Sequence, residues 1–215
     1  KVAIVDPSLT LTMNRNITLS TALDALSQCM EGIVSKKSTP ITDTLALEGC
    51  RIIRKWLPYT LNNLNDIEAR AKIMYASLLS GIVISHTGTT LVHALGYYYT
   101  LNYGIPHGIA NALFLIPMFK RNKKYLPQKV DLIINYLSGS DVERGKLTIE
   151  ECLLSFFEEI DFSNKARDWG IEENRISEFA HNLSQDAYRF RNQPGEFSIQ
   201  DLIDIFRESY IGFHK

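Results

Sequence analysis

The sequence lacks the features that mark secreted, disulfide-bonded or membrane-spanning proteins. Its 215 residues include only 3 cysteines, and Cys29, Cys50 and Cys152 form no CxxC pair. Each cysteine lies in an apolar helical pattern, so we expect buried free thiols and a cytoplasmic, reducing location. No signal peptide opens the chain, and no uninterrupted apolar run reaches the roughly 18 residues of a membrane-spanning helix.

An excess of charge of either sign is also absent. The 23 Lys and Arg residues against 24 Asp and Glu residues leave a formal net charge of −1. This balance gives no reason to expect nucleic acid or a membrane surface as a partner. The one basic cluster, residues 120–124, suits the C-terminal end of a helix, where the helix dipole favours cations.

Several motifs of nucleotide-binding and hydrolytic enzymes are missing. Neither a GxGxxG nor a GxxxxGK[ST] loop occurs, and Ser85-His86-Thr87 is not accompanied by the GxSxG turn of a serine nucleophile. The chain begins at Lys1 rather than at a methionine. We therefore expect a part of a longer protein, with any upstream domain outside this sequence.

The sequence does contain a long succession of amphipathic helical patterns. The 45% hydrophobic content is enough for a substantial core in one domain over residues 1–215. Apart from a short apolar strand expected at residues 2–5, the 3.6-residue periodicity predicts an all-α, multi-helix bundle. We expect helices at 19–34, 38–57, 66–84, 89–100, 107–125, 128–138, from 148 onward, 173–188 and 199–211, with the clearest loops at 139–145 and 191–196.

Prolines and capping residues set the expected helix boundaries. Pro58 should end the second helix and Pro117 should kink the helix at 107–125, because proline cannot donate the intrahelical hydrogen bond. Asn65 is the expected N-cap of the helix at 66–84. Ser198, with Asp201 three residues on, is expected to cap the last helix.

One acid occupies an apolar helical pattern and is a candidate for chemistry. Asp24 and Gln28 are four residues apart, hence on one face of the helix at 19–34. A carboxylate on such a face needs a partner. From the residues alone, Asp24 could bind a metal, cap a neighbouring helix or pair with a buried arginine.

Two histidines complete a set of potential metal ligands. His93 lies among apolar residues, where a hydrogen-bonded core histidine and a metal ligand are both compatible with the pattern. His107 follows Pro106 and precedes Gly108, which predicts a helix N-terminus whose dipole keeps the imidazole neutral. Together with Asp24 they would provide two nitrogens and one oxygen, a donor set that suits zinc or ferrous iron.

Five segments occur in a recognisable order along the chain. They are Ala3-Ile-Val-Asp-Pro7, Thr21-Ala-Leu-Asp-Ala-Leu-Ser-Gln-Cys-Met-Glu-Gly32, Ser38-Thr-Pro-Ile-Thr-Asp43, Gly88-Thr-Thr-Leu-Val-His-Ala-Leu95 and Gly104-Ile-Pro-His-Gly-Ile-Ala-Asn-Ala112. Together they resemble the C-terminal helical domain of the iron-containing (group III) alcohol dehydrogenases, of the dehydroquinate-synthase-like fold. The resemblance covers the whole chain and is strongest up to about Pro117. The fourth and fifth segments also resemble a branch that includes phosphonate-linked aldehyde reductases.

The resemblance implies one half of a two-domain oxidoreductase. The N-terminal NAD(P)-binding domain would lie outside this chain, and residues 1–215 would form the metal-binding domain. Asp24, His93 and His107 match the family's ligand positions for a divalent metal, iron or zinc. The implied reaction is hydride transfer between NAD(P) and a small alcohol or aldehyde, whose oxygen the metal polarises. The chain alone is then expected to be inactive.

Two residues depart from the family pattern and keep alternatives open. Gln28 and Thr89 stand where many members have histidine, so Gln28 would be a weak fourth ligand or a group that orients the site. A metal-free helical module with a structural or interaction role is the alternative, and a hydrolase that uses a metal-bound water is a third option. The assembly state stays open, a homodimer being one option, and neither nucleic acid nor a membrane is expected as a partner.

Overall fold

A computed structural model describes residues 2–138 and 147–214 of the chain. In these residues it contains α-helices and short 3₁₀ helices but no strand. The α-helices are α1 Arg15–Val34, α2 Pro40–Asn62, α3 Ile67–Thr87, α4 Leu91–Tyr103, α5 His107–Ala112, α6 Leu115–Tyr125, α7 Pro127–Leu137, α8 Ile149–Glu159, α9 Ile176–Ser184 and α10 Ile199–Ile211. The 3₁₀ helices are η1 Pro7–Thr10, η2 Ala166–Trp169, η3 Glu173–Arg175 and η4 Ala187–Phe190. The predicted all-α class is confirmed; the loop expected at 139–145 lies outside the described residues.

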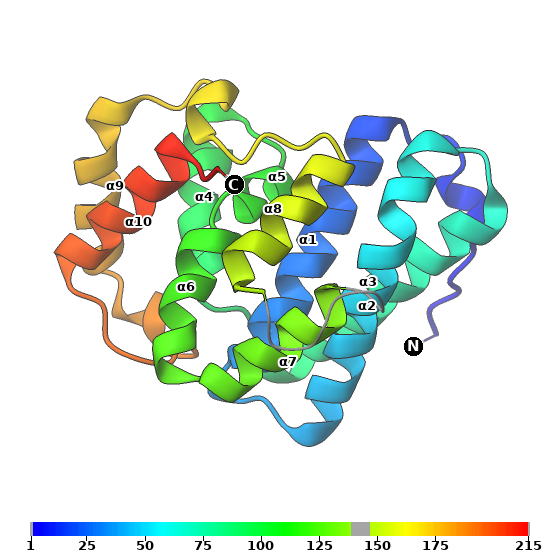
Figure 1. Ribbon diagram of the computed structural model, residues 1–215, viewed down its shortest axis with the longest axis horizontal. Helices are drawn as coiled ribbons and strands as arrows, with labels where there is room; N and C mark the ends of the chain where they lie inside the picture. The colour runs from blue at the N-terminus through cyan, green and yellow to red at the C-terminus, as the bar shows by residue number, and fades with distance from the viewer. Residues whose placement is uncertain (1, 139–146, 215) are drawn as a thin grey trace.

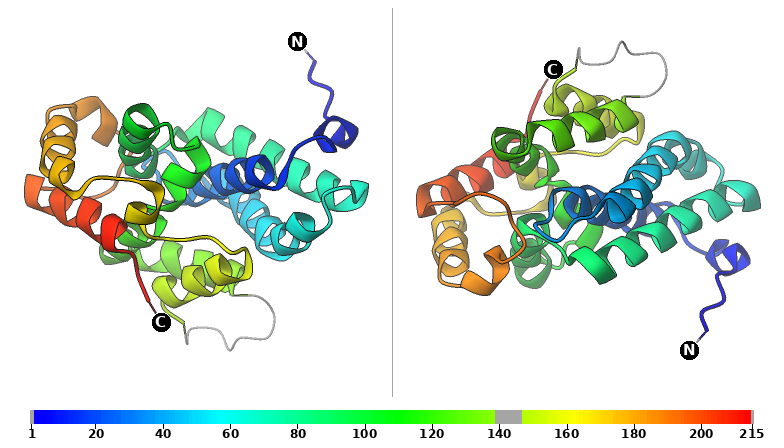
Figure 2. Two further views of the ribbon diagram at one scale, coloured as in Figure 1. Left: turned by 90° about the horizontal axis from the view of Figure 1, so that it is seen from above. Right: turned by 90° about the horizontal axis from the view of Figure 1, so that it is seen from below.

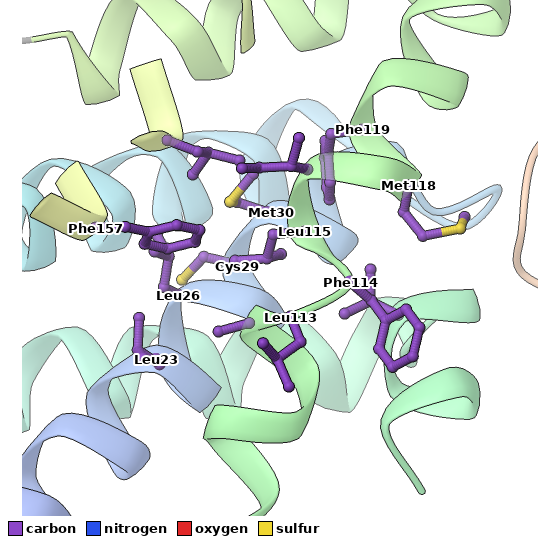
Figure 3. Close-up of a cluster of buried hydrophobic side chains, with 14 of the residues drawn as sticks. Leu23, Leu26, Cys29, Met30, Leu113, Phe114, Leu115, Met118, Phe119 and Phe157 are labelled. Atoms are coloured by element: carbon purple, nitrogen blue, oxygen red, sulfur yellow. The ribbon is translucent and has the colours of Figure 1, made fainter. Parts of the chain in front are cut away.

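Helix α1 is the centre of the bundle. It packs against α2, α3 and α5, with α9 and α10 at the far side of α4 (Figure 1). Its apolar side chains Leu23, Leu26 and Met30 are fully buried. Figure 3 shows them in one cluster with Phe119 and Phe157, so residues far apart in the sequence share this core. Apolar packing on several sides therefore holds α1 in place independently of its polar contacts.

The short strand expected at residues 2–5 is not formed. This segment is extended but exposed, with Ile4 87% accessible, and it projects away from the helices (Figure 2). A strand needs a neighbouring strand to accept and donate its ladder hydrogen bonds. The described residues provide none, so the apolar pattern at 2–5 was not a sufficient signal.

Two proline-based boundaries differ from expectation. Pro58 lies inside α2, which continues to Asn62, because Leu57 and Leu61 on either side are buried in the core and their packing offsets the missing hydrogen bond. The expected helix at 107–125 is divided at residues 113–114 into α5 and α6. Pro117 consequently falls in the first turn of α6, where its missing N–H is harmless.

Further boundaries were shifted or divided. Asp66, and not Asn65, caps α3 by accepting hydrogen bonds from the N–H groups of Glu68 and Ala69. The helix expected at 173–188 consists of η3, α9 and η4.

The three cysteines are buried and free, as expected. Among the described residues, none of the helices combines the length and the apolar character of a membrane-spanning segment; α3 and α4 reach them only together, as a pair bent by 112°.

Candidate metal centre

Asp24, His93 and His107 converge although 83 residues separate the first from the last. They come from α1, α4 and α5, and one potential ligand atom from each lies within 4.8 Å of the other two. Asp24 Oδ1 is 3.4 Å from His93 Nε2 and 3.8 Å from His107 Nε2. The two imidazole rings lie 5.2 Å apart between centroids. The three side chains singled out in the sequence therefore face one common point.

The spacing and chemistry of these atoms suit a divalent metal. Ligand atoms about 2.0–2.2 Å from a tetrahedral metal lie roughly 3.4 Å from one another. The two oxygen–nitrogen separations of 3.4 and 3.8 Å are near this value and longer than ordinary hydrogen bonds. One carboxylate oxygen and two imidazole nitrogens form a donor set for zinc or ferrous iron. The residues present therefore fit the metal that the sequence resemblance implies.

The turn between α4 and α5 brings the two histidines together. Gly104 ends α4 in the left-handed conformation, with φ of 67°, and Pro106 is the N-cap of α5. Because the chain reverses here, His107 returns to the level of His93. Tyr97, one turn after His93, stacks on the His107 ring at 5.0 Å between centroids with an interplanar angle of 27°. The ring of His107 is thus held from one face.

Close backbone approach sets the distance between α5 and α1. A methyl group on Gly108 would overlap the main-chain carbonyl oxygen of Ser20. Only glycine permits this contact. Gly108 directly follows His107, and Ser20 lies one helical turn before Asp24, so the contact sets how closely the two candidate ligands approach. The Pro-His-Gly pattern in the sequence therefore encodes helix packing as well as a candidate ligand.

Gln28 contacts the carboxylate on its other oxygen. Its Nε2 donates a hydrogen bond to Asp24 Oδ2 at 2.7 Å, whereas Oδ1 is the atom near the two histidines. The Gln28 carbonyl oxygen accepts a hydrogen bond from Ser80 Oγ at 2.8 Å. Both polar ends of Gln28 are engaged. This geometry favours the orienting role for Gln28 over that of a fourth ligand.

Sequence reasoning gave no role to Glu31, which is in direct contact with the site. Its side chain is fully buried and its Oε2 is hydrogen-bonded to His93 Nδ1. Glu31 lies seven residues after Asp24, two helical turns along the same face. An acid at that spacing in an apolar stretch is the signal that could have found it.

Asn111 belongs to the segment Gly104–Ala112, but its residue type and spacing indicate no role by themselves. Its Nδ2 donates to Asp24 Oδ1 at 2.9 Å and lies 3.2 Å from His107 Nε2. It follows His107 by four residues and therefore shares its helix face. Gly96 makes room for Asn111, since a methyl group there would overlap Asn111 Oδ1. Asn111 thus ties the carboxylate to α5.

Burial and mutual charge shift the pKa values of all three candidate ligands. Burial alone would raise the pKa of Asp24, but contact with His93, and to a lesser degree with His107 and Asn111, brings it below its usual value. Burial would lower the pKa of His93, yet the carboxylates of Glu31 and Asp24 raise it to about 10. Burial lowers the pKa of His107, assisted by His93 and opposed by Asp24. Near pH 7 the site without metal therefore holds an ionised Asp24 carboxylate, a neutral His107 imidazole and a protonated His93 ring, whose Nε2 proton a bound metal would displace.

Known proteins resemble this chain along nearly its whole length. The model of the Fe-containing alcohol dehydrogenase family, C-terminal, matches residues 18–210. An NAD-dependent methanol dehydrogenase from Bacillus methanolicus is 28% identical over 216 residues, which cover 97% of this chain and 55% of that protein. A 1,3-propanediol dehydrogenase from Citrobacter freundii is 28% identical over 214 residues, with 97% and 55% coverage.

Solved structures share the helical arrangement. An iron-containing alcohol dehydrogenase from Thermotoga maritima is 37% identical, with a TM-score of 0.81 over 95% of this chain and 52% of that one. A sulfoacetaldehyde reductase from Bifidobacterium kashiwanohense, solved in complex with NAD+, is 29% identical, with a TM-score of 0.85 and coverage of 98% and 54%.

The chain spans about half the length of the relatives it matches. Where the alignment extends along nearly the whole chain, it covers 51–55% of the relative's own sequence. The family expected from the five sequence segments is confirmed by the match over residues 18–210. The chain belongs to the Fe-containing alcohol dehydrogenase family and corresponds to its C-terminal, helical part.

Proposed function

We propose that residues 1–215 are the metal-binding half of an NAD(P)-dependent alcohol dehydrogenase or aldehyde reductase that acts on a small alcohol or aldehyde. The convergence of Asp24, His93 and His107 within 4.8 Å carries the proposal. The named relatives, which include an NAD-dependent methanol dehydrogenase and a reductase solved with NAD+, support the reaction class. NAD(P) would bind to a domain outside this chain.

The residues of this chain have separate tasks in the proposed site. Asp24, His93 and His107 would hold the divalent metal through one oxygen and two nitrogens. When bound, such a metal supplies Lewis acidity that polarises an alcohol or carbonyl oxygen. Gln28 and Asn111 orient the Asp24 carboxylate by one hydrogen bond to each of its oxygens. These two contacts leave its Oδ1 edge directed at the histidines.

Metal binding by the purified chain tests the proposal. We expect one zinc or ferrous ion per chain, with the affinity of Asp24→Ala and His107→Ala reduced by more than the roughly 100-fold that loss of a hydrogen-bonding neighbour costs. His86→Ala is the matched control, because His86 is exposed on α3 and its ring hydrogen-bonds to its own helix, at Ser85 Oγ and the Ile82 carbonyl oxygen. Equal metal content in all four proteins would contradict the proposal.

Activity measurements separate the proposed function from its alternatives. Since the chain has no nucleotide-binding loop, it should show no NAD(P)-dependent turnover by itself, even when loaded with metal; measurable turnover would overturn this expectation. Failure to take up zinc or iron would favour the metal-free module suggested by Gln28. Hydrolytic activity without nucleotide would favour a metal-dependent hydrolase.

A further inference from the structure

Glu31 is a buried carboxylate whose side chain is hydrogen-bonded to the N-cap and first turn of α4. It emerges from α1, its side chain is 0% exposed, and its partner His93 is 6% exposed. A buried carboxylate without partners is strongly destabilising, so each of its oxygens needs hydrogen-bond donors. The donors that Glu31 uses are all at the N-terminus of α4.

The first oxygen of Glu31 replaces a missing helix cap. Thr90 is the N-cap residue of α4, but its own side chain makes no capping hydrogen bond. Instead, Glu31 Oε1 accepts hydrogen bonds from Thr90 N–H at 2.8 Å, Thr90 Oγ1 at 2.7 Å and His93 N–H at 3.3 Å. A carboxylate at this position also complements the positive end of the helix dipole. Glu31 thus fixes the first turn of α4 to α1.

The second oxygen of Glu31 contacts the imidazole of that same turn. Glu31 Oε2 lies against His93 Nδ1, and Asp24 Oδ1 lies 3.4 Å from His93 Nε2. The two acids are seven residues and roughly 10 Å apart along α1, on one face of the helix. One helix therefore presents a carboxylate to each nitrogen of a single ring.

We propose that Glu31 is a positioning residue that clamps His93 so that Nε2 is presented to the metal. The inference rests on the proposed metal site and adds to it the residue that orients one of its ligands. Because Glu31 is an acceptor, Nδ1 must be the nitrogen that donates a proton to it. Nε2 is then the nitrogen that faces Asp24 and His107. Hydrogen-bonded neighbours of this kind set the orientation of metal-bound histidines generally.

The test compares Glu31→Gln with Thr90→Val in the 215-residue chain, with zinc titrated against a chelator of known affinity. Glutamine keeps the shape of Glu31 but can present an N–H to Nδ1, which reverses the hydrogen bond. We expect zinc affinity to fall by about 10–100-fold in Glu31→Gln. Thr90→Val removes one hydrogen bond to Oε1 and leaves the Oε2–Nδ1 contact, so affinity should stay within about threefold of the unmodified chain. Unchanged affinity in Glu31→Gln, or an equal loss in Thr90→Val, would overturn the proposal.

A spectrum of the metal-free chain gives a second measurement that does not depend on metal uptake. Long-range ¹H–¹⁵N correlations, recorded above pH 10 where the His93 ring is neutral, should show His93 with a protonated Nδ1 and an unprotonated Nε2, and this signature should change in Glu31→Gln. An unprotonated Nδ1 in the unmodified chain would refute the role of Glu31. If the unmodified chain binds no zinc while Nδ1 is protonated, the proposed metal function fails and the orientation of His93 by Glu31 stands.

Discussion

The helices up to α5 and the helices from α6 onward bury different kinds of side chain. The buried charged side chains of the described residues, Glu31, Arg70 and His93, all come from the first group. The second group carries most of the fully buried aromatic rings: Phe206 of α10 lies 5.3 Å from Phe114, 5.9 Å from Phe179 and 5.9 Å from Tyr99 of α4 between ring centroids. Both groups bury apolar side chains, but within the described residues only the first group also buries charged ones.

This difference separates the parts of the fold that set the site from those that support it. Arg70 is 2% exposed, yet its guanidinium donates to Leu64 O, Thr18 Oγ1 and Met13 O. Buried charges that lack such partners are strongly destabilising, so their contacts restrict how the first group can change. Apolar packing in the second group tolerates exchange more readily, provided that volume is kept.

The largest expected effect is on the stability of the second group. Phe206→Ala should lower the free energy of unfolding by about 3–5 kcal/mol, because a ring packed against several other rings leaves a cavity. Denaturant unfolding monitored by circular dichroism measures this loss. Zinc affinity of the folded fraction should stay within about threefold, since the ring contacts of Phe206 are with other aromatic side chains, Tyr98, Tyr99, Phe114 and Phe179. A large loss of affinity in the folded protein would show that the two groups are coupled.

A smaller effect on stability, together with an effect on zinc affinity, is expected where α5 meets α1. Gly108→Ala forces a methyl group onto the carbonyl oxygen of Ser20, so α5 must shift and carry His107 with it. We expect a loss of about 1–3 kcal/mol of stability together with at least roughly tenfold weaker zinc binding. Gly81→Ala in α3 is the control, since no atom lies within 4 Å of the added methyl group. That control should be about 0.5–1 kcal/mol more stable, with zinc binding unchanged.

The smallest effect concerns the cap of α10. Ser198→Ala should cost about 1 kcal/mol and leave zinc binding unchanged. Hydrogen bonds from the Ser198 side chain and N–H lower the pKa of Asp201. The folded pKa is below the unfolded value of about 3.9, so this contribution is complete above that value and is lost as pH falls through the folded pKa. The difference in unfolding free energy between the variant and the unmodified chain should therefore be larger at pH 7 than below pH 3, where the bond from Asp201 N–H to Ser198 Oγ still contributes; a difference that does not change with pH would argue against the pair.

Local signals predicted much of the fold. The Ser198–Asp201 pair was expected from its spacing and is present as a capping box, because a cap depends only on residues three apart. The end of α2 depends instead on the burial of Leu57 and Leu61, and packing there overrides the local effect of Pro58. The prediction of a strand at 2–5 was wrong for the same kind of reason. A strand depends on a neighbouring strand, and the described residues provide none.

The candidate site divides in the same way. Asp24, His93 and His107 were found in the sequence because their residue types and segments resemble a family. The part played by Glu31 was not visible, since it requires knowing that the first turn of α4 lies beside α1 and lacks a side-chain cap of its own. Hydrogen-bonding neighbours of a site depend on tertiary contacts, which no local pattern contains.

The position of Asp24 and Glu31 on one helix has a consequence for how this segment can vary in length. A single inserted or deleted residue between them would rotate one carboxylate by about 100° around α1 and remove it from the His93 ring. Side chains at the intervening positions can be exchanged without that rotation. The number of residues between Asp24 and Glu31 is therefore constrained more strictly than their types. An insertion at residues 25–27 should weaken zinc binding more than a substitution at the same positions.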